Sequence, residues 1–212
     1  MSSIASQFAQ QLLEVQCIKL QPTQPFTWAS GWLSPFYCDN RKTLAYPKVR
    51  TFVKDQLAAL IRAQYPEATA IAGVATGAIA QGALVADALD LPMCYVRAKA
   101  KDHGMGNLIE GTLPEGAKVV VVEDLISTGG SSLKAVEALR AAGFEILGMV
   151  ASFTYGFPVA EEAFRAANVT LTTLTNYEAV VETARAIGYI EESHLPLLAR
   201  WRANPSTWSP EV

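Results

Sequence analysis

The sequence has 212 residues, of which 50% are hydrophobic and 17% charged, and its formal net charge is −3. This composition can bury a core and excludes a disordered chain, and without a basic run the chain lacks the cationic surface that nucleic-acid binding requires. No apolar stretch approaches the roughly 18 residues of a membrane span, and the first residues lack the basic and apolar regions of a signal peptide. The three cysteines are far apart without a CxxC pair, which is typical of a reducing cytoplasm. We therefore expect a cytoplasmic protein with neither nucleic-acid nor membrane partners.

The first third of the chain contains two predicted helices. Apolar residues three or four apart predict an amphipathic helix over residues 2–20. Prolines and glycine interrupt residues 21–35, which are expected to form a loop, and residues 36–40 have the composition of a short strand. Helical spacing returns over residues 46–66, where Pro66 ends the second helix.

A regular alternation of strands and helices follows. The predicted strands are 69–76, 93–96, 118–124, 145–153 and 169–175, and the predicted helices are 78–90, 131–143, 158–167, 177–188 and 194–203. This order predicts right-handed βαβ units and therefore an α/β fold with a mostly parallel sheet flanked by helices. Residues 1–45 and the C-terminal segment fall outside the alternation. We expect them to form a small hood over a core at 46–175, within one domain of residues 1–212.

Residues 119–132, VVVVEDLISTGGSS, combine a buried strand with groups suited to a phosphorylated sugar. Ligands of open α/β sheets bind at the carboxyl ends of strands, where Glu123 and Asp124 stand. The helix that begins near Gly130 or Ser131 offers free N–H groups and a partial positive charge to phosphate. Carboxylates suit neutral hydroxyls or a divalent metal. Ribose 5-phosphate has hydroxyls for the two carboxylates and a phosphate for the helix start, so it would satisfy both groups. The alternative interpretation is a capped helix after a buried strand. A Walker site is excluded because the chain has no GxxxxGK[ST] loop.

Residues 97–111, RAKAKDHGMGNLIEG, form a second candidate site. Cationic side chains alternate here, so in an extended conformation they project from one side: Arg97, Lys99, Lys101 and His103. Three glycines follow, which make the segment hard to hold in one shape. Such a loop could close over a multiply charged anion. The alternative is a solvated surface loop.

Together these stretches resemble the type I phosphoribosyltransferases, and within them the orotate phosphoribosyltransferases. VVVVEDLISTGGSS resembles the family's signature for phosphoribosyl pyrophosphate (PRPP), and residues 71–80 stand at its pyrophosphate-contacting turn. Residues 97–111 resemble the mobile catalytic loop of the orotate enzymes, and residues 26–41 resemble their base-binding segment. The resemblance implies the type I phosphoribosyltransferase fold and a Mg²⁺-dependent reaction of PRPP with orotate, which yields orotidine 5′-monophosphate and pyrophosphate. It also implies a homodimer in which the 97–111 loop reaches the neighbouring site.

The resemblance assigns roles position by position. It implies a PRPP site formed by Arg97, Lys99, Lys101, His103, Glu123, Asp124, Leu125, Ile126, Ser127, Thr128, Gly129, Gly130 and Ser131. Within this set the implied catalytic residues are Lys101, His103 and Asp124. Orotate contacts are implied for Ser127, Phe36 and Tyr37, with backbone N–H groups of residues 34–37 binding the orotate carboxylate. Mg²⁺ would be held mainly by PRPP, with Glu123 and Asp124 as the candidate protein ligands, so no dedicated metal site is expected.

Three positions depart from some members of the family. Ala29 and Gly77 stand where certain orotate enzymes have lysine, and Tyr155 stands where they have arginine. We interpret these differences as variation within one activity. Two other functions stay open at this point: a phosphoribosyltransferase for another base, and a non-catalytic PRPP-binding regulator.

Overall fold

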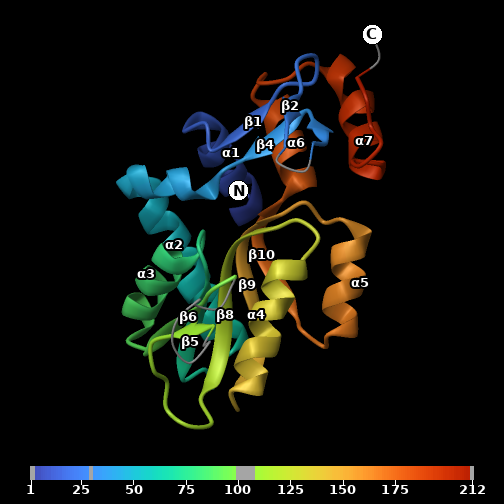
Figure 1. The fold of residues 1–212 in the computed structure, drawn as a ribbon. Helices are drawn as coiled ribbons and strands as arrows, with labels where there is room; N and C mark the ends of the chain where they lie inside the picture. Colours follow the sequence, from blue (N-terminus) through green and yellow to red (C-terminus); the bar gives the residue numbers. More distant parts are fainter. Residues whose placement is uncertain (1–2, 29–30, 99–107, 211–212) are drawn as a thin grey trace. The chain divides into compact units, whose positions relative to one another are not determined.

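The structure is a computed structural model that describes residues 3–28, 31–98 and 108–210. The chain divides into two compact units (Figure 1). The terminal unit comprises Met1–Tyr46 and Thr175–Val212, and the core unit comprises Pro47–Leu174.

The core unit is built on a six-stranded sheet in the order β10-β9-β8-β5-β6-β7. These strands are β5 (Ala70–Val74), β6 (Met93–Val96), β7 (Ile109–Glu110), β8 (Lys118–Ile126), β9 (Glu145–Thr154) and β10 (Leu171–Asn176). β5 pairs in parallel with β6 and β8, β8 pairs in parallel with β9, and the short β7 pairs antiparallel with its neighbour β6. The sheet is therefore mostly parallel, as predicted.

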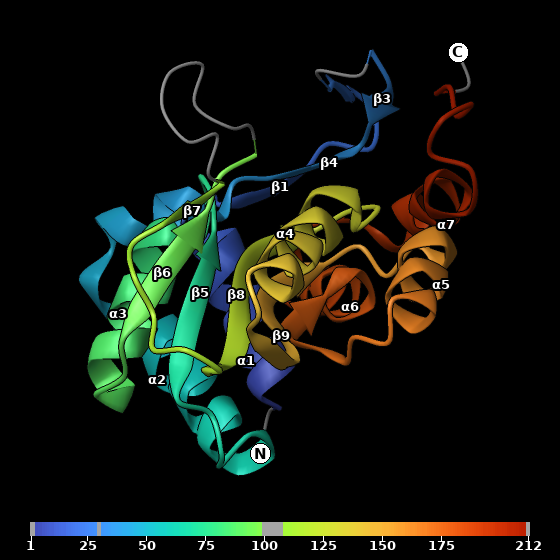
Figure 2. The same ribbon diagram turned by 60° about the horizontal axis from the view of Figure 1, so that its bottom comes forward.

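Helices cover both faces of this sheet (Figure 2). α2 (Pro47–Gln64) and α3 (Ile79–Leu89) lie on one face, and α4 (Gly130–Ala141) and α5 (Pro158–Ala166) lie on the other. Val119 and Val121 of β8 belong to the apolar cluster shared with α4 and α5, while Val120 and Val122, which alternate with them, are equally buried. The unbroken run of valines follows from this burial on both faces. Among the described helices, α2 is the longest, and none has the length and apolar content of a membrane span.

The terminal unit combines both ends of the chain. Its elements are α1 (Ile4–Glu14), β1 (Ile18–Leu20), β2 (Phe26–Thr27), β3 (Leu33–Ser34), β4 (Phe36–Cys38), η1 (Asn40–Ala45), α6 (Tyr177–Ala186), η2 (Glu192–His194) and α7 (Leu195–Ala203). β1 pairs antiparallel with β4, and β2 with β3. The rings of Phe36, Tyr177 and Trp201 pack together, with centroids 5.2 to 6.3 Å apart, and join β4 to α6 and α7.

Two predictions for the N-terminal region were wrong. The first helix does not extend to residue 20: it ends at Glu14, Gln16 adopts a left-handed conformation with φ 54°, and β1 follows. Residues 21–35 are not simply a loop, because they contain the β2–β3 hairpin. Strands of two or three residues are too short to produce a recognisable alternation.

Candidate active site

The site lies where the chain order of the strands reverses. β5 is followed in sequence by β6 on one side, but its neighbour on the other side is β8. The register pairs Gly73 of β5 with Val122 of β8, so the residues after β5 and those at the end of β8 lie at the same edge. Ligands of open α/β sheets bind at such a switch point, outside the carboxyl ends of the strands.

Glu123 is buried at this edge, with 5% of its surface exposed. Its Oε1 accepts the N–H of Asp124 at 2.9 Å, and its Oε2 accepts the hydroxyl of Ser132 at 2.8 Å. Burial, together with the adjacent charge of Asp124, raises the pKa of Glu123 to about 8. Glu123 is thus a largely enclosed carboxyl group whose two oxygens are already hydrogen-bonded.

Asp124 is more exposed and lies against the turn that follows β5. A Cβ atom at Gly77 would be 2.2 Å from Oδ2 and 2.4 Å from Cγ of Asp124. This distance is far shorter than a van der Waals contact, so Asp124 can occupy its observed position only because residue 77 has no side chain. The same turn contains the cis peptide bond Ala75–Thr76.

The predicted phosphate cradle is the start of α4. The helix begins at Gly130, as predicted, after Gly129 with φ 81°, and the N-cap forms no side-chain hydrogen bond. In contrast, Ser3 caps α1 and Asn176 caps α6 with their side chains. The first backbone N–H groups of a helix have no partner within the helix and attract anions. An uncapped, glycine-flanked start therefore suits a phosphate.

The cradle combines exposed and buried positions. Thr128, Gly130 and Ser131 are exposed and Ser127 is half-buried, so a ligand could reach them. Ile126 is fully buried and could contact PRPP only through its backbone, whereas Leu125 is half-buried.

Gly129 is fixed from behind by α5. A Cβ at Gly129 would lie 2.8 Å from Cε2 of Phe164, whose ring is buried beneath the turn. The turn that carries the cradle therefore rests directly on an aromatic ring of the core unit.

The cationic segment is described only at its two ends. The N–H of Arg97 donates to the carbonyl of Leu108 at 2.8 Å, and β6 pairs with β7, so the two ends form an antiparallel stem. Arg97 also forms an ion pair with Glu110 at 3.3 Å. The predicted sites Lys99, Lys101 and His103 lie outside the described residues.

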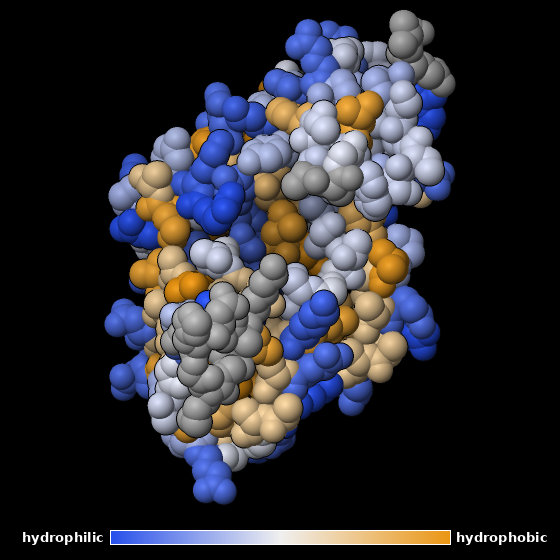
Figure 3. All heavy atoms as spheres, viewed as in Figure 1, coloured by the Kyte–Doolittle hydropathy of each residue, from blue (hydrophilic) through white to orange (hydrophobic). Residues whose placement is uncertain are grey.

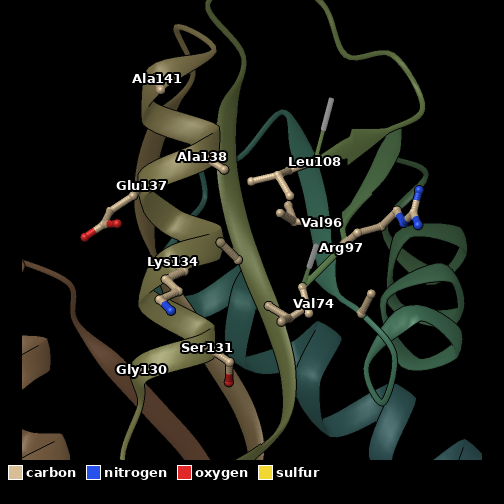
Figure 4. Close-up of a pocket in the computed structure, with 13 residues that line it drawn as sticks. Val74, Val96, Arg97, Leu108, Gly130, Ser131, Lys134, Glu137, Ala138 and Ala141 are labelled. Atoms are coloured by element: carbon tan, nitrogen blue, oxygen red, sulfur yellow. The ribbon is translucent and has the colours of Figure 1, made fainter. Parts of the chain in front are cut away.

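A cavity of about 760 Å³ lies between α4 and this stem (Figure 4). Ser131 and Lys134 line it from α4, and Val96 and Leu108 line it from the other side, whereas the guanidinium of Arg97 points away from α4. Figure 3 shows apolar surface beside α4 on the same face, next to charged side chains. The start of α4 thus opens into a partly apolar hollow.

The predicted orotate residues lie in the terminal unit, where Phe36 is completely buried in the aromatic cluster. Its N–H donates to Oγ of Ser34 at 3.1 Å, and its carbonyl accepts Nε1 of Trp28 at 3.2 Å. A contact from the Phe36 side chain would therefore require the cluster to open. Tyr37 is half-buried and its ring lies 5.4 Å from that of Phe26, so Tyr37 is the more accessible of the two.

Two residues of the site were missed by the sequence reasoning. Gly77 was noted only as a departure from the family pattern, although its missing side chain admits Asp124. Ser132 was noted only as the last residue of the stretch 119–132, but it is 1% exposed and donates to Glu123. A signal for Ser132 existed in the sequence: it shares the buried face of α4 with Ala135, Val136 and Leu139, and a buried hydroxyl on an apolar face needs a partner.

Comparisons with known proteins identify the family of the chain. The phosphoribosyl transferase domain family matches residues 49–186. An orotate phosphoribosyltransferase of Bacteroides thetaiotaomicron is 64% identical over 208 residues, covering 98% of each chain. The crystal structure of orotate phosphoribosyltransferase from Aeropyrum pernix has 28% identity and a TM-score of 0.75, covering 87% of this chain and 99% of its own. That of the Mycobacterium tuberculosis enzyme in complex with PRPP has 21% identity and a TM-score of 0.65, covering 84% and 98%, and shows the shared fold. The chain belongs to the phosphoribosyltransferase family and, within it, to the orotate phosphoribosyltransferases.

Proposed function

We propose that the chain transfers the 5-phosphoribosyl group of PRPP to orotate and releases pyrophosphate, at the switch point between β5 and β8. The observation that carries the site is the placement of the Asp124 carboxylate, held against Gly77, a few residues before the uncapped start of α4. The carboxylate can accept hydrogen bonds from the ribose hydroxyls, and the start of α4 can bind the phosphate, so the two groups match the two ends of ribose 5-phosphate. The 64% identity to a named orotate enzyme supports orotate as the acceptor.

In this proposal Asp124 binds the ribose hydroxyls, and residues 127–131 bind the 5-phosphate. Lys101 and His103, with Arg97 and Lys99, bind the pyrophosphate. Cleavage of the C1–O bond leaves positive charge on the ribose and negative charge on pyrophosphate. Cations that bind more strongly as that negative charge develops lower the barrier, because they stabilise the transition state more than the ground state. The N1 proton of orotate leaves as the N1–C1 bond forms and can be taken up by the departing pyrophosphate, so no side chain is assigned as a general base.

The residues at the site fit a magnesium ion held mainly by the substrate. Within the described part of the chain, no group of three or more His, Cys, Asp or Glu side chains could hold a metal. Both oxygens of Glu123 are engaged, so Asp124 is the carboxylate best placed to contribute. One carboxylate together with substrate phosphates is a common environment for Mg²⁺. When bound, the ion would neutralise charge on the pyrophosphate.

The decisive experiment follows the loss of orotate absorbance with PRPP and Mg²⁺. Wild type should consume orotate but not uracil, adenine or hypoxanthine, and both Asp124→Asn and Lys101→Ala should be at least about a hundredfold slower. Lys118→Ala is the control, because it removes a lysine at the opposite end of β8. If wild type forms no nucleotide from orotate, the proposed function is wrong.

The proposal places the protein in the cytoplasm, where the free Cys17, Cys38 and Cys94 would stay reduced. It also includes a homodimer in which residues 97–111 of one subunit act at the partner's site. A mixture of the Asp124→Asn and Lys101→Ala variants tests whether residues 97–111 act at the partner's site. After mixing and subunit exchange, a heterodimer contains one site with both Asp124 and a wild-type loop, so about one quarter of the wild-type activity should return. Loops that act on their own subunit would restore nothing.

A further inference from the structure

Ser132 connects the two elements that carry the ligand groups. It lies in the first turn of α4, is 1% exposed, and donates its hydroxyl to Oε2 of Glu123 at 2.8 Å. Through Oε1, Glu123 accepts the N–H of Asp124 at 2.9 Å. A continuous hydrogen-bonded link therefore runs from the helix that carries the cradle to the backbone of the residue that carries the carboxylate.

Packing alone does not explain this serine. The other buried residues on its face of α4 are Ala135, Val136 and Leu139, all apolar. A buried hydroxyl costs free energy unless it is hydrogen-bonded, so an apolar residue would be the simpler choice for stability. Nor does the hydroxyl cap the helix, because the N-cap of α4 has no side-chain hydrogen bond.

The link bridges a segment that is otherwise partly exposed. Between Asp124 and α4 the chain passes through Ser127, which is half-buried, and Thr128, which is exposed. The ring of Phe164 in α5 lies directly against Gly129 and supports this segment, but that contact does not involve β8. The Ser132–Glu123 hydrogen bond ties α4 directly to the end of β8.

We propose that Ser132 is a positioning residue that, through Glu123, fixes the distance between the Asp124 carboxylate and the phosphate cradle, so that one ribose 5-phosphate engages both. This inference rests on the proposed function of the site. A ligand bound at two linked points gains affinity only if the spacing of those points matches its own. Loss of the link should therefore weaken a two-ended ligand and leave a one-ended ligand unaffected.

The test compares ribose 5-phosphate with inorganic phosphate by calorimetry on wild type, Ser132→Ala and Ser132→Thr. Ribose 5-phosphate reaches both points, whereas phosphate reaches only the cradle. In Ser132→Ala the affinity for ribose 5-phosphate should fall about fivefold, while that for phosphate stays within about a factor of two. Ser132→Thr keeps the hydroxyl and should restore most of the difference. In turnover, Ser132→Ala should raise KM for PRPP more than it lowers kcat.

Thr175→Val is the matched control, because it removes a buried hydroxyl that donates to the carbonyl of Ala5 at 2.9 Å within the terminal unit. It should lower the melting temperature without changing either affinity. Equal weakening of both ligands in Ser132→Ala, or no weakening, would overturn the inference while leaving the proposed site intact. Failure of wild type to bind either ligand would overturn both.

Discussion

The carboxylate of Asp124 occupies the space that a side chain at residue 77 would fill, with Oδ2 2.2 Å from the position of a Cβ atom. A Cβ atom at residue 77 would clash with Cγ of Asp124 as well as with both carboxylate oxygens. Asp124 must therefore rotate, or the turn must move, if any side chain is added at residue 77. Gly77 therefore determines where the proposed ribose-binding carboxylate lies.

Gly77→Ala should raise KM for PRPP at least about tenfold, because a carboxylate displaced by even 1 Å no longer meets the ribose hydroxyls. Steady-state kinetics check this. Gly116→Ala is the control: a Cβ there meets no atom within 4 Å, although φ is 68°. That variant should lose about 1 kcal/mol of stability and keep its KM. An unchanged KM in Gly77→Ala would show that Asp124 is free to move without consequence.

Gly129 and Phe164 should be energetically coupled. Gly129→Ala adds a Cβ 2.8 Å from the Phe164 ring at a position with φ 81°, so it should destabilise the fold by at least about 1 kcal/mol. Phe164→Ala should cost about 3 kcal/mol through the cavity that it leaves. The double variant removes the clash, so its loss should be smaller than the sum by about 1 kcal/mol. Urea unfolding of the four proteins measures the coupling, and strict additivity would contradict the contact.

The α/β alternation was predictable because it depends on local pattern. The four valines of β8 and the glycine–serine run after it are contiguous, so one window of sequence contains strand, acids and helix start. The predicted start of α4 is confirmed for the same reason.

The contacts that organise the site were not predictable, because they join segments distant in sequence. Gly77 meets Asp124 only through the pairing of β5 with β8, and Phe164 meets Gly129 only through the packing of α5 beside α4. The β2–β3 hairpin was missed for a different reason, since its two-residue strands carry too little pattern.

Glu123 should make the stability of the fold depend on pH. Burial raises its pKa from 4.5 to about 8, so the folded state binds a proton that the unfolded state releases above pH 4.5. The stabilising contribution is therefore fully present below pH 4.5 and is lost as the pH rises toward and through 8. Glu123→Gln keeps the shape but cannot titrate. Between pH 5 and 8 the melting temperature of wild type should fall relative to that of the variant, and parallel curves would contradict the raised pKa.

Trp201 should influence orotate more than PRPP. It is completely buried, its ring lies parallel to that of Phe36 with centroids 6.3 Å apart, and its Nε1 donates to the carbonyl of Leu33 at 3.2 Å. Trp201→Phe keeps an aromatic ring but removes this hydrogen bond, so the strands that contain Leu33 and Phe36 should lose their fixed position at a cost of about 1 to 3 kcal/mol.

Trp201 contacts Phe36 and Leu33. The proposed base-binding segment, residues 34–37, contains Phe36 and directly follows Leu33. KM for orotate should therefore rise several-fold in Trp201→Phe, while KM for PRPP, whose proposed site lies in the core unit, should stay within about a factor of two. Tyr189→Phe serves as the control, because this aromatic side chain is exposed in the same unit and should change neither constant. Equal increases of both constants in Trp201→Phe would show that the aromatic cluster supports the whole fold and has no particular role in holding the base-binding segment.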